Sequence, residues 1–439
     1  MTRPIQIGLL GVGTVGGGVA TLLSRKSAAI AAETGRGIEL RRALVRDPAR
    51  QRSVELPASI MTTDPAAVIE DPEIDVVVEV MGGIDPAREY VRRAIAAGKH
   101  VVTANKDLMA MHGVEILRAA AERGVDVYYE ASVGGGIPLI GVFRQDLVAN
   151  EVRAVHAIIN GTTNYILTRM AQDGVDFAPA LAEAQSLGYA EPDPTNDVEG
   201  IDAAYKLAIL ASLAFRTAVE PQHIHREGIS RLRAADFRYA RELGYVIKLL
   251  AIGRRQPGAG AGAPDEVEVR VHPALVPHDF LLADVNGVFN AVHVQGDLVG
   301  NVLFYGRGAG AEPTSSAVVS DVIEVAHNLN AGVSNRIPLH FGAALAVRPM
   351  SALETRYYVR LWVADRPGVL AKIAQVFGDH AISIASCIQK ETDESAGTAE
   401  LVIVTHQARE ADMQAAVAEF RGLEIVRELA NVVRIEQVA

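Results

Sequence analysis

Short apolar runs alternate with longer amphipathic stretches along the first 130 residues of the chain. The runs are rich in β-branched residues and stay apolar on consecutive positions, which is typical of strands buried on both faces of a sheet. The stretches between most of them have helical spacing. This alternation predicts βαβ units and hence a doubly wound parallel sheet. The predicted strands lie at residues 5–10, 38–45, 75–81, 100–104 and 125–131.

The pattern changes after Glu130. Gly-rich and polar loops separate the helices up to residue 200, and a mixed region with short strands is expected at 267–345. Segment 255–266 is rich in Gly, Ala and Pro, which cannot pack a core, so we expect a flexible surface loop inserted within a domain.

A third pattern begins near Thr355 and has the order βαββαβ. We therefore expect an α/β chain with a Rossmann-type parallel sheet at 1–130, an α+β domain at 131–350 and a βαββαβ domain at 355–439. Cys387 and Trp362 are expected to pack inside the last domain. Its predicted elements are strands at 357–365, 381–391, 398–406 and 432–438, and helices within 366–380 and 413–423.

Composition narrows the functional classes. The 439 residues include 49% hydrophobic ones, which is enough to bury real cores. A single cysteine excludes an intrachain disulfide framework and a CxxC zinc module. The formal net charge of −11 argues against nucleic acid as a partner. No apolar run approaches about 18 residues, and no signal peptide is apparent, so we expect a cytoplasmic protein with no membrane partner.

A glycine motif follows the first predicted strand. Gly11, Gly13 and Gly16 spell GxGxxG, with Thr14 and Val15 between the second and third glycines. In a dinucleotide-binding turn the first glycine allows the tight bend, the second admits the pyrophosphate, and the third lets helix and strand pack closely. The positive end of the helix then faces the anion. The alternative is a tight structural turn in a domain that binds no nucleotide.

The end of the second predicted strand bears on coenzyme choice. An acidic residue there, about 20 positions after the glycines, would hold the 2′-hydroxyl of NAD. Arg46 stands there instead, followed by Asp47. A guanidinium can meet a 2′-phosphate bidentately, so the sequence favours NADP over NAD. The alternative is that Arg46 is only solvated.

The segment 188–206 combines an acidic loop with a lysine. In the helix that follows the loop, Asp202 and Lys206 are four residues apart on one face, and Leu210 and Leu213 continue that stripe. We expect Lys206 on an otherwise buried stripe beside carboxylates, an environment that suits a proton-exchanging lysine. The alternatives are an ordinary surface ion pair and, for the loop, a calcium site, although the EF-hand spacing is absent. The loop carboxylates are Glu191, Asp193, Asp197, Glu199 and Asp202.

These motifs together resemble the homoserine dehydrogenase family, in its long bacterial form with a C-terminal ACT domain. The resemblance covers nearly the whole chain, and the string at 188–206 is its most specific part. It implies conversion of L-aspartate 4-semialdehyde to L-homoserine with NADPH or NADH, on the route to threonine and methionine. The motifs, in family order, are GxGxVG (11–16), TANK (103–106), EASVGGGIP (130–138), NGTTNYIL (160–167), GYAEPDPTNDVEGIDAAYK (188–206) and YGRGAG (305–310).

The resemblance also implies roles for individual residues. Lys206 matches the proton donor to the aldehyde oxygen, and Lys106 matches a second lysine near cofactor and substrate. Glu191 and Asp202 match carboxylates that hold the substrate amino group, and two further loop residues, Asp197 and Tyr189, are expected to help. The remaining matches are Gly188 and Gly306 for the cofactor, and Glu130, Val133, Gly135 and Ile137 for a structural sodium ion held largely by backbone oxygens.

Four further expectations concern the substrate carboxylate, the middle domain, the oligomeric state and the ACT domain. For the substrate carboxylate we expect the backbone N–H groups near Gly161 and Thr162, which lead into a helix. The resemblance further implies that 131–350 is a catalytic and dimerisation domain, that the protein is a homodimer or homotetramer, and that threonine binds the ACT turn Asp365–Gly368 and inhibits. The alternatives are an ACT module that only supports assembly, and an amino-acid sensor with an inactive dehydrogenase core.

Overall fold

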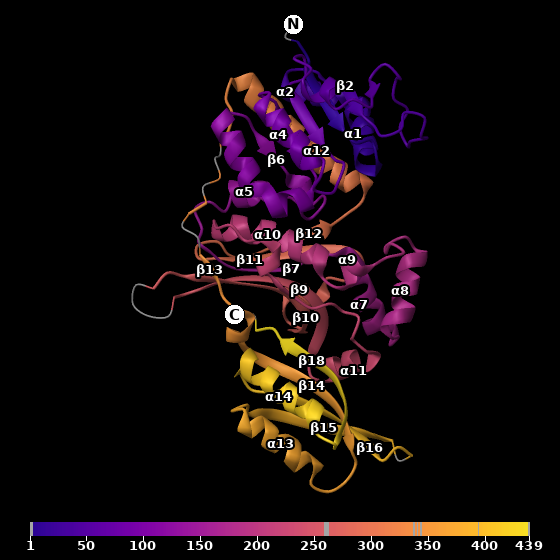
Figure 1. Cartoon of the computed structure of the whole chain (residues 1–439), viewed down its shortest axis with the longest axis vertical. Helices are drawn as coiled ribbons and strands as arrows, with labels where there is room; N and C mark the ends of the chain where they lie inside the picture. The colour runs from indigo at the N-terminus through magenta and orange to yellow at the C-terminus, as the bar shows by residue number, and fades with distance from the viewer. Residues whose placement is uncertain are drawn as a thin grey trace. The chain divides into compact units, whose positions relative to one another are not determined.

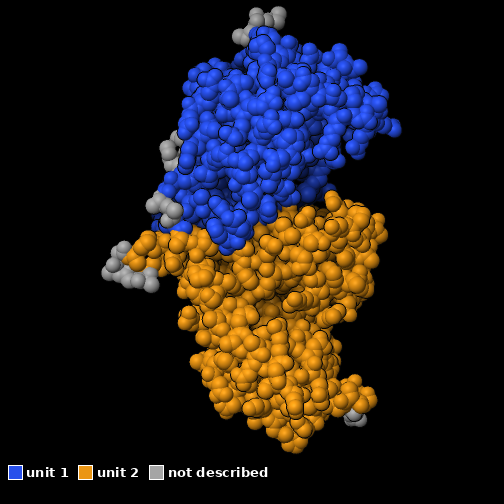
Figure 2. All heavy atoms as spheres, viewed as in Figure 1, with its two compact units in different colours: residues 1–155, 205–223, 294–345 blue, residues 156–204, 224–293, 346–439 orange. Residues whose placement is uncertain are grey.

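The computed structural model describes residues 3–258, 263–336, 339, 341–342, 345–393 and 395–437. The chain divides into two compact units that interleave along the sequence (Figure 2). Unit 1 comprises residues 1–155, 205–223 and 294–345, and unit 2 comprises residues 156–204, 224–293 and 346–439. Unit 1 therefore adds two later segments to the N-terminal region, while the domain boundaries predicted from the sequence stay predictions.

A six-stranded sheet forms the centre of unit 1, in the order β3-β2-β1-β4-β5-β6 (Figure 1). All of its strand pairs are parallel, which confirms the predicted doubly wound arrangement. Only β3, a strand of two residues, was not predicted. The strands are β1 (Ile5–Leu10), β2 (Ile38–Leu44), β3 (Met61–Thr62), β4 (Val76–Glu79), β5 (His100–Thr103) and β6 (Val127–Tyr128).

Helices cover this sheet and complete its core. The long helix α12 comes from a region expected to contain short strands, yet its residues Val318, Val322 and Val325 are buried in one cluster with Ile5 and Ile7 of β1. The other elements of unit 1 include α1 (Thr14–Arg25), α2 (Ser27–Thr34), α3 (Ala66–Ile69), α4 (Ala87–Ala96), α5 (Lys106–Arg123), η1 (Glu130–Ser132), α6 (Ile140–Arg144), η2 (Pro221–His223), β12 (Gly300–Arg307) and α12 (Ala311–Ala331).

The larger sheet contains the strands of unit 2 in the order β11-β7-β9-β10-β18-β14-β16-β15. Its centre is the antiparallel pair β9 and β10, each of twelve residues. The segment that joins them is the predicted surface loop, of which residues 259–262 lie outside the described part of the chain. The first strands are β7 (Val152–Ile158), β8 (His225–Arg226), β9 (Tyr245–Gln256), β10 (Glu266–Pro277), β11 (Phe289–Gly296) and β13 (Ala346–Val347).

Short and medium helices connect these strands. Helix α10 starts in unit 2 and continues into unit 1. No helix in the described residues is both long enough and apolar enough to cross a bilayer. The helical elements are α7 (Gly161–Asp173), α8 (Phe177–Ser186), α9 (Thr195–Val198), α10 (Ile201–Phe215), α11 (Ala234–Glu242), η3 (Leu281–Asp284) and η4 (Met350–Ala352).

The C-terminal part of unit 2 has the predicted βαββαβ order. Alternation along β14 explains its two buried faces: Tyr357 and Val359 pack with α13 and α14, whereas Tyr358 and Arg360 hydrogen-bond Asp236 of α11 on the other side. The elements are β14 (Glu354–Ala364), α13 (Val369–Asp379), β15 (Ile384–Asp393), β16 (Thr398–Thr405), a short β17 (Ala408–Arg409), α14 (Glu410–Gly422) and β18 (Val426–Ile435).

Three expectations for this region differ from the structure. Cys387 is exposed rather than buried, because β15 is the last strand of the sheet and its residues are largely exposed. Trp362 is only partly buried. The final strand begins at Val426, earlier than the predicted 432, and Val438 lies outside the described residues.

Candidate active site

The glycine turn of unit 1 has the geometry of a phosphate-binding site. Gly11 has φ +98°, which a residue with a side chain rarely adopts. A Cβ on Gly16 would lie 2.1 Å from the carbonyl oxygen of Gly11, so helix and turn approach too closely for any other residue. Gly13 caps α1, and nothing lies within 4 Å of where its Cβ would be. Thr14 and Val15 then begin the helix, whose N–H groups suit a pyrophosphate.

A cavity of about 490 Å³ opens beside this turn. Its lining joins the turn to the ends of β2 and β4, and it includes Arg46, as expected for a residue that reads the adenosine end of a dinucleotide. Arg50 and Arg52 also line it and were not singled out from the sequence, although the basic string 46–52 (RDPARQR) was a visible signal. Three arginines and Asp47 thus line this cavity, and the Arg52 guanidinium donates to backbone carbonyls of the same loop, among them that of Arg50 (2.7 Å).

Lys106 is placed by a buried hydrogen-bond network at the ends of β4 and β5. It is the first residue of α5, whose cap Asn105 accepts from the Leu108 N–H (3.1 Å). The Thr103 hydroxyl donates to Glu79 (2.6 Å), and the Asn105 amide donates to the Gly83 carbonyl (2.6 Å).

Glu79 is the centre of that network and was missed by sequence reasoning. Its carboxylate also accepts the Met81 N–H (2.8 Å), so it ties the loop after β4 to the loop that carries Lys106. Burial raises the pKa of Glu79, although hydrogen bonds from Thr103 and Met81 oppose the shift. A lone acid within a strand of apolar residues gives no local sign of such a role.

Lys206 lies on the stripe that its spacing predicts. Leu210 and Leu213 are buried, at 0% and 4% exposure, while Lys206 itself is half-buried. Asp202 precedes it by one turn of α10 and is buried. The stripe around Lys206 is therefore mostly buried and apolar, and its role in proton exchange stays a prediction.

Asn160 brings two of the loop carboxylates together in unit 2. Its side-chain amide donates to Asp197 (2.6 Å) and to Asp202 (2.9 Å). Its side-chain oxygen Oδ1 accepts the Thr163 N–H (2.8 Å) and so caps α7. Asn160 was quoted only as part of a motif, and nothing local in the sequence identifies both partners. The two carboxylates are thus gathered into one site by a residue about 40 positions upstream.

Gly161 and Thr162, the first residues of α7, lie next to the start of the acidic segment. The Thr162 hydroxyl donates to the Tyr189 carbonyl (2.7 Å), and the Tyr189 ring packs on Tyr165 with ring centres 5.0 Å apart. Gly188 has φ +74° and ends the preceding helix region. Glu191 is exposed, and the Gln185 amide holds its backbone carbonyl (3.0 Å).

The expected sodium loop of unit 1 packs against the YGRGAG motif. A Cβ on Gly135 would lie 2.5 Å from the Gly308 carbonyl oxygen, and one on Gly306 would lie 3.1 Å from the Ile137 side chain. The structure therefore brings Gly306 beside Ile137, and Gly308 beside Gly135. Val133 lies within the same loop and is buried.

The Glu130 carboxylate already has partners in this loop. It accepts the N–H groups that open α6, those of Leu139 (2.5 Å), Ile140 (2.8 Å) and Gly141 (2.7 Å). The Glu130 N–H donates to Asp321 (2.8 Å), whose pKa is raised well above its usual range by burial and by the nearby Glu130 charge. A cation bound in this loop would therefore be held by backbone oxygens, as the family resemblance implies.

Three matches assign this chain to a family. Residues 138–323 match "Homoserine dehydrogenase", residues 11–130 match "Homoserine dehydrogenase, NAD binding domain", and residues 357–424 match "ACT domain". The homoserine dehydrogenase of Pseudomonas aeruginosa is 46% identical, over 99% of this chain and 100% of its own. The chain belongs to the homoserine dehydrogenase family.

Solved structures of homoserine dehydrogenases agree with this assignment. The one from Thiobacillus denitrificans is 45% identical, has a TM-score of 0.89 and covers 99% of both chains. A hyperthermophilic archaeal homoserine dehydrogenase in complex with NADPH is 26% identical, with a TM-score of 0.60, over 74% of this chain and 98% of its own. The protein is accordingly an NAD(P)-dependent oxidoreductase that acts on CH–OH groups.

The part of the chain that matches the ACT domain has a cavity of its own. The cavity measures about 430 Å³ and is bounded by the turn between β14 and α13, together with Gln389 of β15. Asp365 is held there by its N–H, which donates to the Gly397 carbonyl (2.9 Å), and Gly368 caps α13 with φ +89°. This is the turn, Asp365–Gly368, at which an effector was expected.

Proposed function

We propose that the protein interconverts L-homoserine and L-aspartate 4-semialdehyde, with Lys206 as proton donor and acceptor. The observation that carries the proposal is the cluster around Asn160. It gathers Asp197 and Asp202 at the start of α10, and the next turn of that helix carries Lys206. An amino-acid substrate needs anionic partners for its ammonium, and its carbonyl oxygen needs a proton source.

The substrate's charged groups match the residues of unit 2. Asp202 and Asp197 hold the ammonium group of the substrate. Glu191 and Tyr189, from the same loop, complete this part of the site. The N–H groups of Gly161 and Thr162, at the start of α7, receive the carboxylate, because a helix N-terminus favours anions. These assignments follow from charge complementarity and from the placement of Tyr189 against Thr162.

The lysines handle the charge that develops on the substrate oxygen. When bound, the nicotinamide coenzyme supplies or accepts the hydride. Lys206 gives a proton to the oxygen during reduction and takes it back during oxidation. Lys106 stabilises the developing alkoxide electrostatically, held in place by the Glu79–Thr103–Asn105 network.

The coenzyme is held by unit 1, and NADP is the preferred form. Gly11, Gly13, Thr14, Val15 and Gly16 cradle the pyrophosphate. Gly188 and Gly306 add backbone contacts, and Arg46 receives the 2′-phosphate. The three arginines of the cavity support this choice, as does the NADPH complex of the archaeal relative.

The coenzyme preference is open to a direct test. Arg46→Ala removes one guanidinium from the cavity and should raise the KM for NADPH by about tenfold, since one hydrogen bond to a charged group contributes about 1.5–3 kcal/mol. The KM for NADH should change little. An equal effect on both coenzymes would show that Arg46 does not read the 2′-phosphate.

We also propose a structural sodium ion and an effector. The ion is held by the backbone oxygens of Glu130, Val133, Gly135 and Ile137. Threonine binds the ACT cavity at Asp365–Gly368 and inhibits the enzyme, which works as a cytoplasmic homodimer or homotetramer. Titration of activity against L-threonine tests the effector, and an unchanged rate and affinity would remove it.

The reaction itself is tested by absorbance at 340 nm. The purified protein is given L-homoserine with NADP⁺ or NAD⁺, and separately L-aspartate 4-semialdehyde with the reduced coenzymes. The proposal predicts turnover in both directions and a lower KM for NADP⁺. Turnover of a different hydroxy amino acid with no activity on homoserine would overturn the proposed substrate.

A further inference from the structure

The segment 227–230 is packed tightly against the corner that joins α9 to α10. A Cβ on Gly228 would lie 2.5 Å from both the Glu199 carboxylate and the Val198 carbonyl oxygen. The Ile229 N–H donates to the same Val198 carbonyl (2.8 Å), and the Ser230 hydroxyl donates to Glu199 (2.8 Å). Val198 and Glu199 lie between Asp197 and Asp202, so this segment packs against the stretch of chain that joins the two carboxylates bridged by Asn160.

Glu227 anchors that segment at its start. Its N–H donates to the Val271 carbonyl of β10 (2.8 Å). Its carboxylate oxygen Oε1 lies 2.9 Å from Nε2 of His225 and accepts from Nη2 of Arg434 (2.8 Å). Partial burial opposes the charge, but these two partners outweigh it and hold the pKa of Glu227 well below its usual range. Glu227 is therefore an anion with three fixed attachments.

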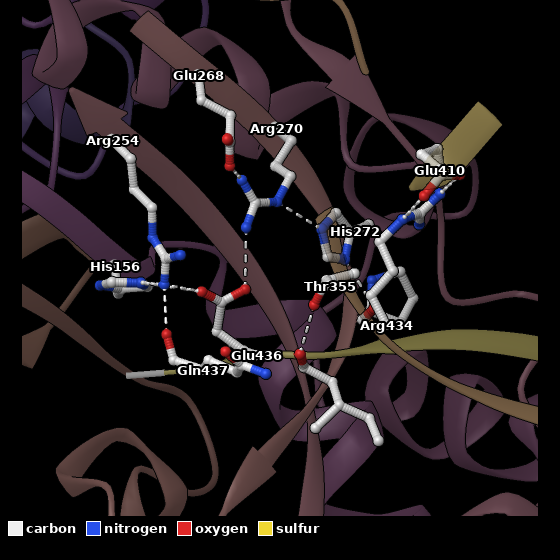
Figure 3. A network of polar contacts seen from close by, with 12 residues as sticks. His156, Arg254, Glu268, Arg270, His272, Thr355, Glu410, Arg434, Glu436 and Gln437 are labelled. Carbon is white, nitrogen blue, oxygen red and sulfur yellow. Dashed lines mark hydrogen bonds and ion pairs between the residues drawn. The ribbon is translucent and has the colours of Figure 1, made fainter. Parts of the chain in front are cut away.

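Arg434 connects this anchor to the ACT domain. It lies on β18, the last ACT strand, and only 4% of it is exposed. Its Nε and Nη2 atoms donate to both carboxylate oxygens of Glu410 at the start of α14 (2.8 and 2.5 Å), and the Tyr357 hydroxyl donates to Glu410 as well (2.8 Å). Figure 3 shows Arg434 and Glu410 at one end of a buried polar network that also includes His272 and Arg270.

Strand pairing holds β18 in the register that this contact needs. Ala274 of β10 pairs with Arg434, Leu275 pairs with Ile435, and the Glu436 N–H donates to the Leu275 carbonyl (2.9 Å). The Arg434 guanidinium thus reaches Glu227 from β18, which pairs with β10. Glu227 is also attached to β10, through the carbonyl of Val271. A chain of short contacts leads from the ACT core to the acidic segment.

We propose that Glu227 is a positioning residue for homoserine, and that Arg434 makes strand β18 of the ACT domain part of the support of the substrate site. Glu227 holds segment 227–230 so that Val198 and Glu199 keep Asp197 and Asp202 at the separation that suits one ammonium group. The inference rests on the proposed binding of the substrate ammonium by these two aspartates.

The test compares Michaelis constants rather than stability alone. Glu227→Gln keeps the shape of the side chain and removes its charge, so the pull of Arg434 and His225 on the segment weakens. We expect the KM for homoserine to rise about tenfold, while kcat and the KM for NADP⁺ stay within about twofold, because an interaction made equally in ground and transition state affects binding alone. Ser230→Ala, which cuts the link to Glu199, should shift the same constant in the same direction.

A matched control separates positioning from general damage. Arg360 is an equally buried ACT arginine. It forms ion pairs with Asp236 (2.7 Å) and Glu400 (2.9 Å), neither of which belongs to segment 227–230. Arg360→Gln should lower the unfolding temperature without raising the KM for homoserine. Arg434→Gln should do both, and Arg434→Lys should restore part of the homoserine affinity.

The outcomes distinguish this inference from its premise. If Asp202→Asn raises the KM for homoserine but Glu227→Gln and Ser230→Ala leave it unchanged, Glu227 does not position the site and the inference is overturned. If Asp202→Asn itself leaves that KM unchanged, the proposed substrate contact fails and the inference falls with it. If Arg434→Gln does not fold, the Glu227→Gln and Ser230→Ala variants still test the positioning role, because both side chains are only partly buried.

Discussion

At the scale of single residues, the glycines of the predicted phosphate-binding turn are required for different reasons. Gly16 is required by contact, because its Cβ would overlap the carbonyl oxygen of Gly11. Gly13 is surrounded by open space, so a methyl group there would disturb no part of the chain. This open space suits the proposed approach of a pyrophosphate to the backbone.

This difference predicts opposite phenotypes for the same substitution. Gly16→Ala should lower the free energy of unfolding by several kcal/mol, since a rigid backbone oxygen must move. Gly13→Ala should leave the unfolding temperature nearly unchanged but raise the KM for NADP⁺ by about tenfold or more, because the methyl occupies the ligand's space. Thermal unfolding and coenzyme titration on both variants check this. A stable Gly16→Ala protein with normal coenzyme affinity would contradict the assigned roles.

The tight glycine turn was predictable from sequence because it depends on neighbours within a few residues. The role of Glu79 was not predictable, because its partner Thr103 comes 24 residues later and is brought beside it only once β4 and β5 pair. A single acid at the end of an apolar strand looks alike whether it organises two loops or faces solvent.

At the scale of elements, helix α7 begins at a residue with two functions. The side-chain oxygen Oδ1 of Asn160 caps the helix, and its side-chain N–H groups donate to Asp197 and Asp202. The cap is a local signal, since Asn is favoured at this position. The bridge is not local, because α9 and α10 come much later in the chain.

Two substitutions separate these functions. Asn160→Asp keeps a capping oxygen but adds a third negative charge beside two carboxylates, so the KM for homoserine should change severalfold or more with little loss of helix stability. Asn160→Ala should also remove the cap, which costs about 0.5–2 kcal/mol. Steady-state kinetics and urea unfolding measure both effects. Identical behaviour of the two variants in both assays would refute the division of roles.

The elements themselves were largely predictable. Continuous β-branched runs predicted five strands of the parallel sheet. The alternation of strand-like and helix-like spacing of apolar residues predicted the βαββαβ order. The pairing of β18 with β10 was not predictable, because strand register depends on a partner about 160 residues away and leaves no local mark. The same holds for α12, whose apolar face matches a core built by the first strands of the chain.

At the scale of the whole molecule, buried histidines tie stability to pH. His272 is fully buried, and its Nδ1–H donates to the Pro273 carbonyl while Nε2 accepts from Arg270. Burial, together with the Arg434 and Arg270 charges, lowers its pKa to about 3. Burial lowers the pKa of His293 to about 4. Both are therefore neutral in the folded protein and gain protons only on unfolding.

The sign of the pH dependence follows. Between about pH 6.5 and the folded pKa, the unfolded chain binds protons that the folded chain does not, so stability falls as pH falls. His272 alone should lower the free energy of unfolding by about 2 kcal/mol at pH 5 relative to neutral pH. Urea unfolding at pH 7.5 and pH 5.0 measures the loss.

Two variants test the origin of that loss. His272→Gln keeps an acceptor for Arg270 and should reduce the difference in unfolding free energy between the two pH values. His223→Gln, at an exposed histidine, should leave the difference unchanged. Equal stability of the parent protein at both pH values would contradict the assignment of neutral buried histidines.

The most direct test of the account concerns the lysine of α10. Lys206→Ala removes the proposed proton donor, while Lys390→Ala removes an exposed lysine of the ACT domain as a control. For Lys206→Ala we predict a fall in kcat of about 10²–10⁴-fold, the usual contribution of a general acid, with NADPH binding measured by fluorescence unchanged. Lys390→Ala should turn over normally. A Lys206→Ala enzyme whose kcat stays within about threefold of the parent would contradict the proton-transfer role on which the proposed mechanism depends.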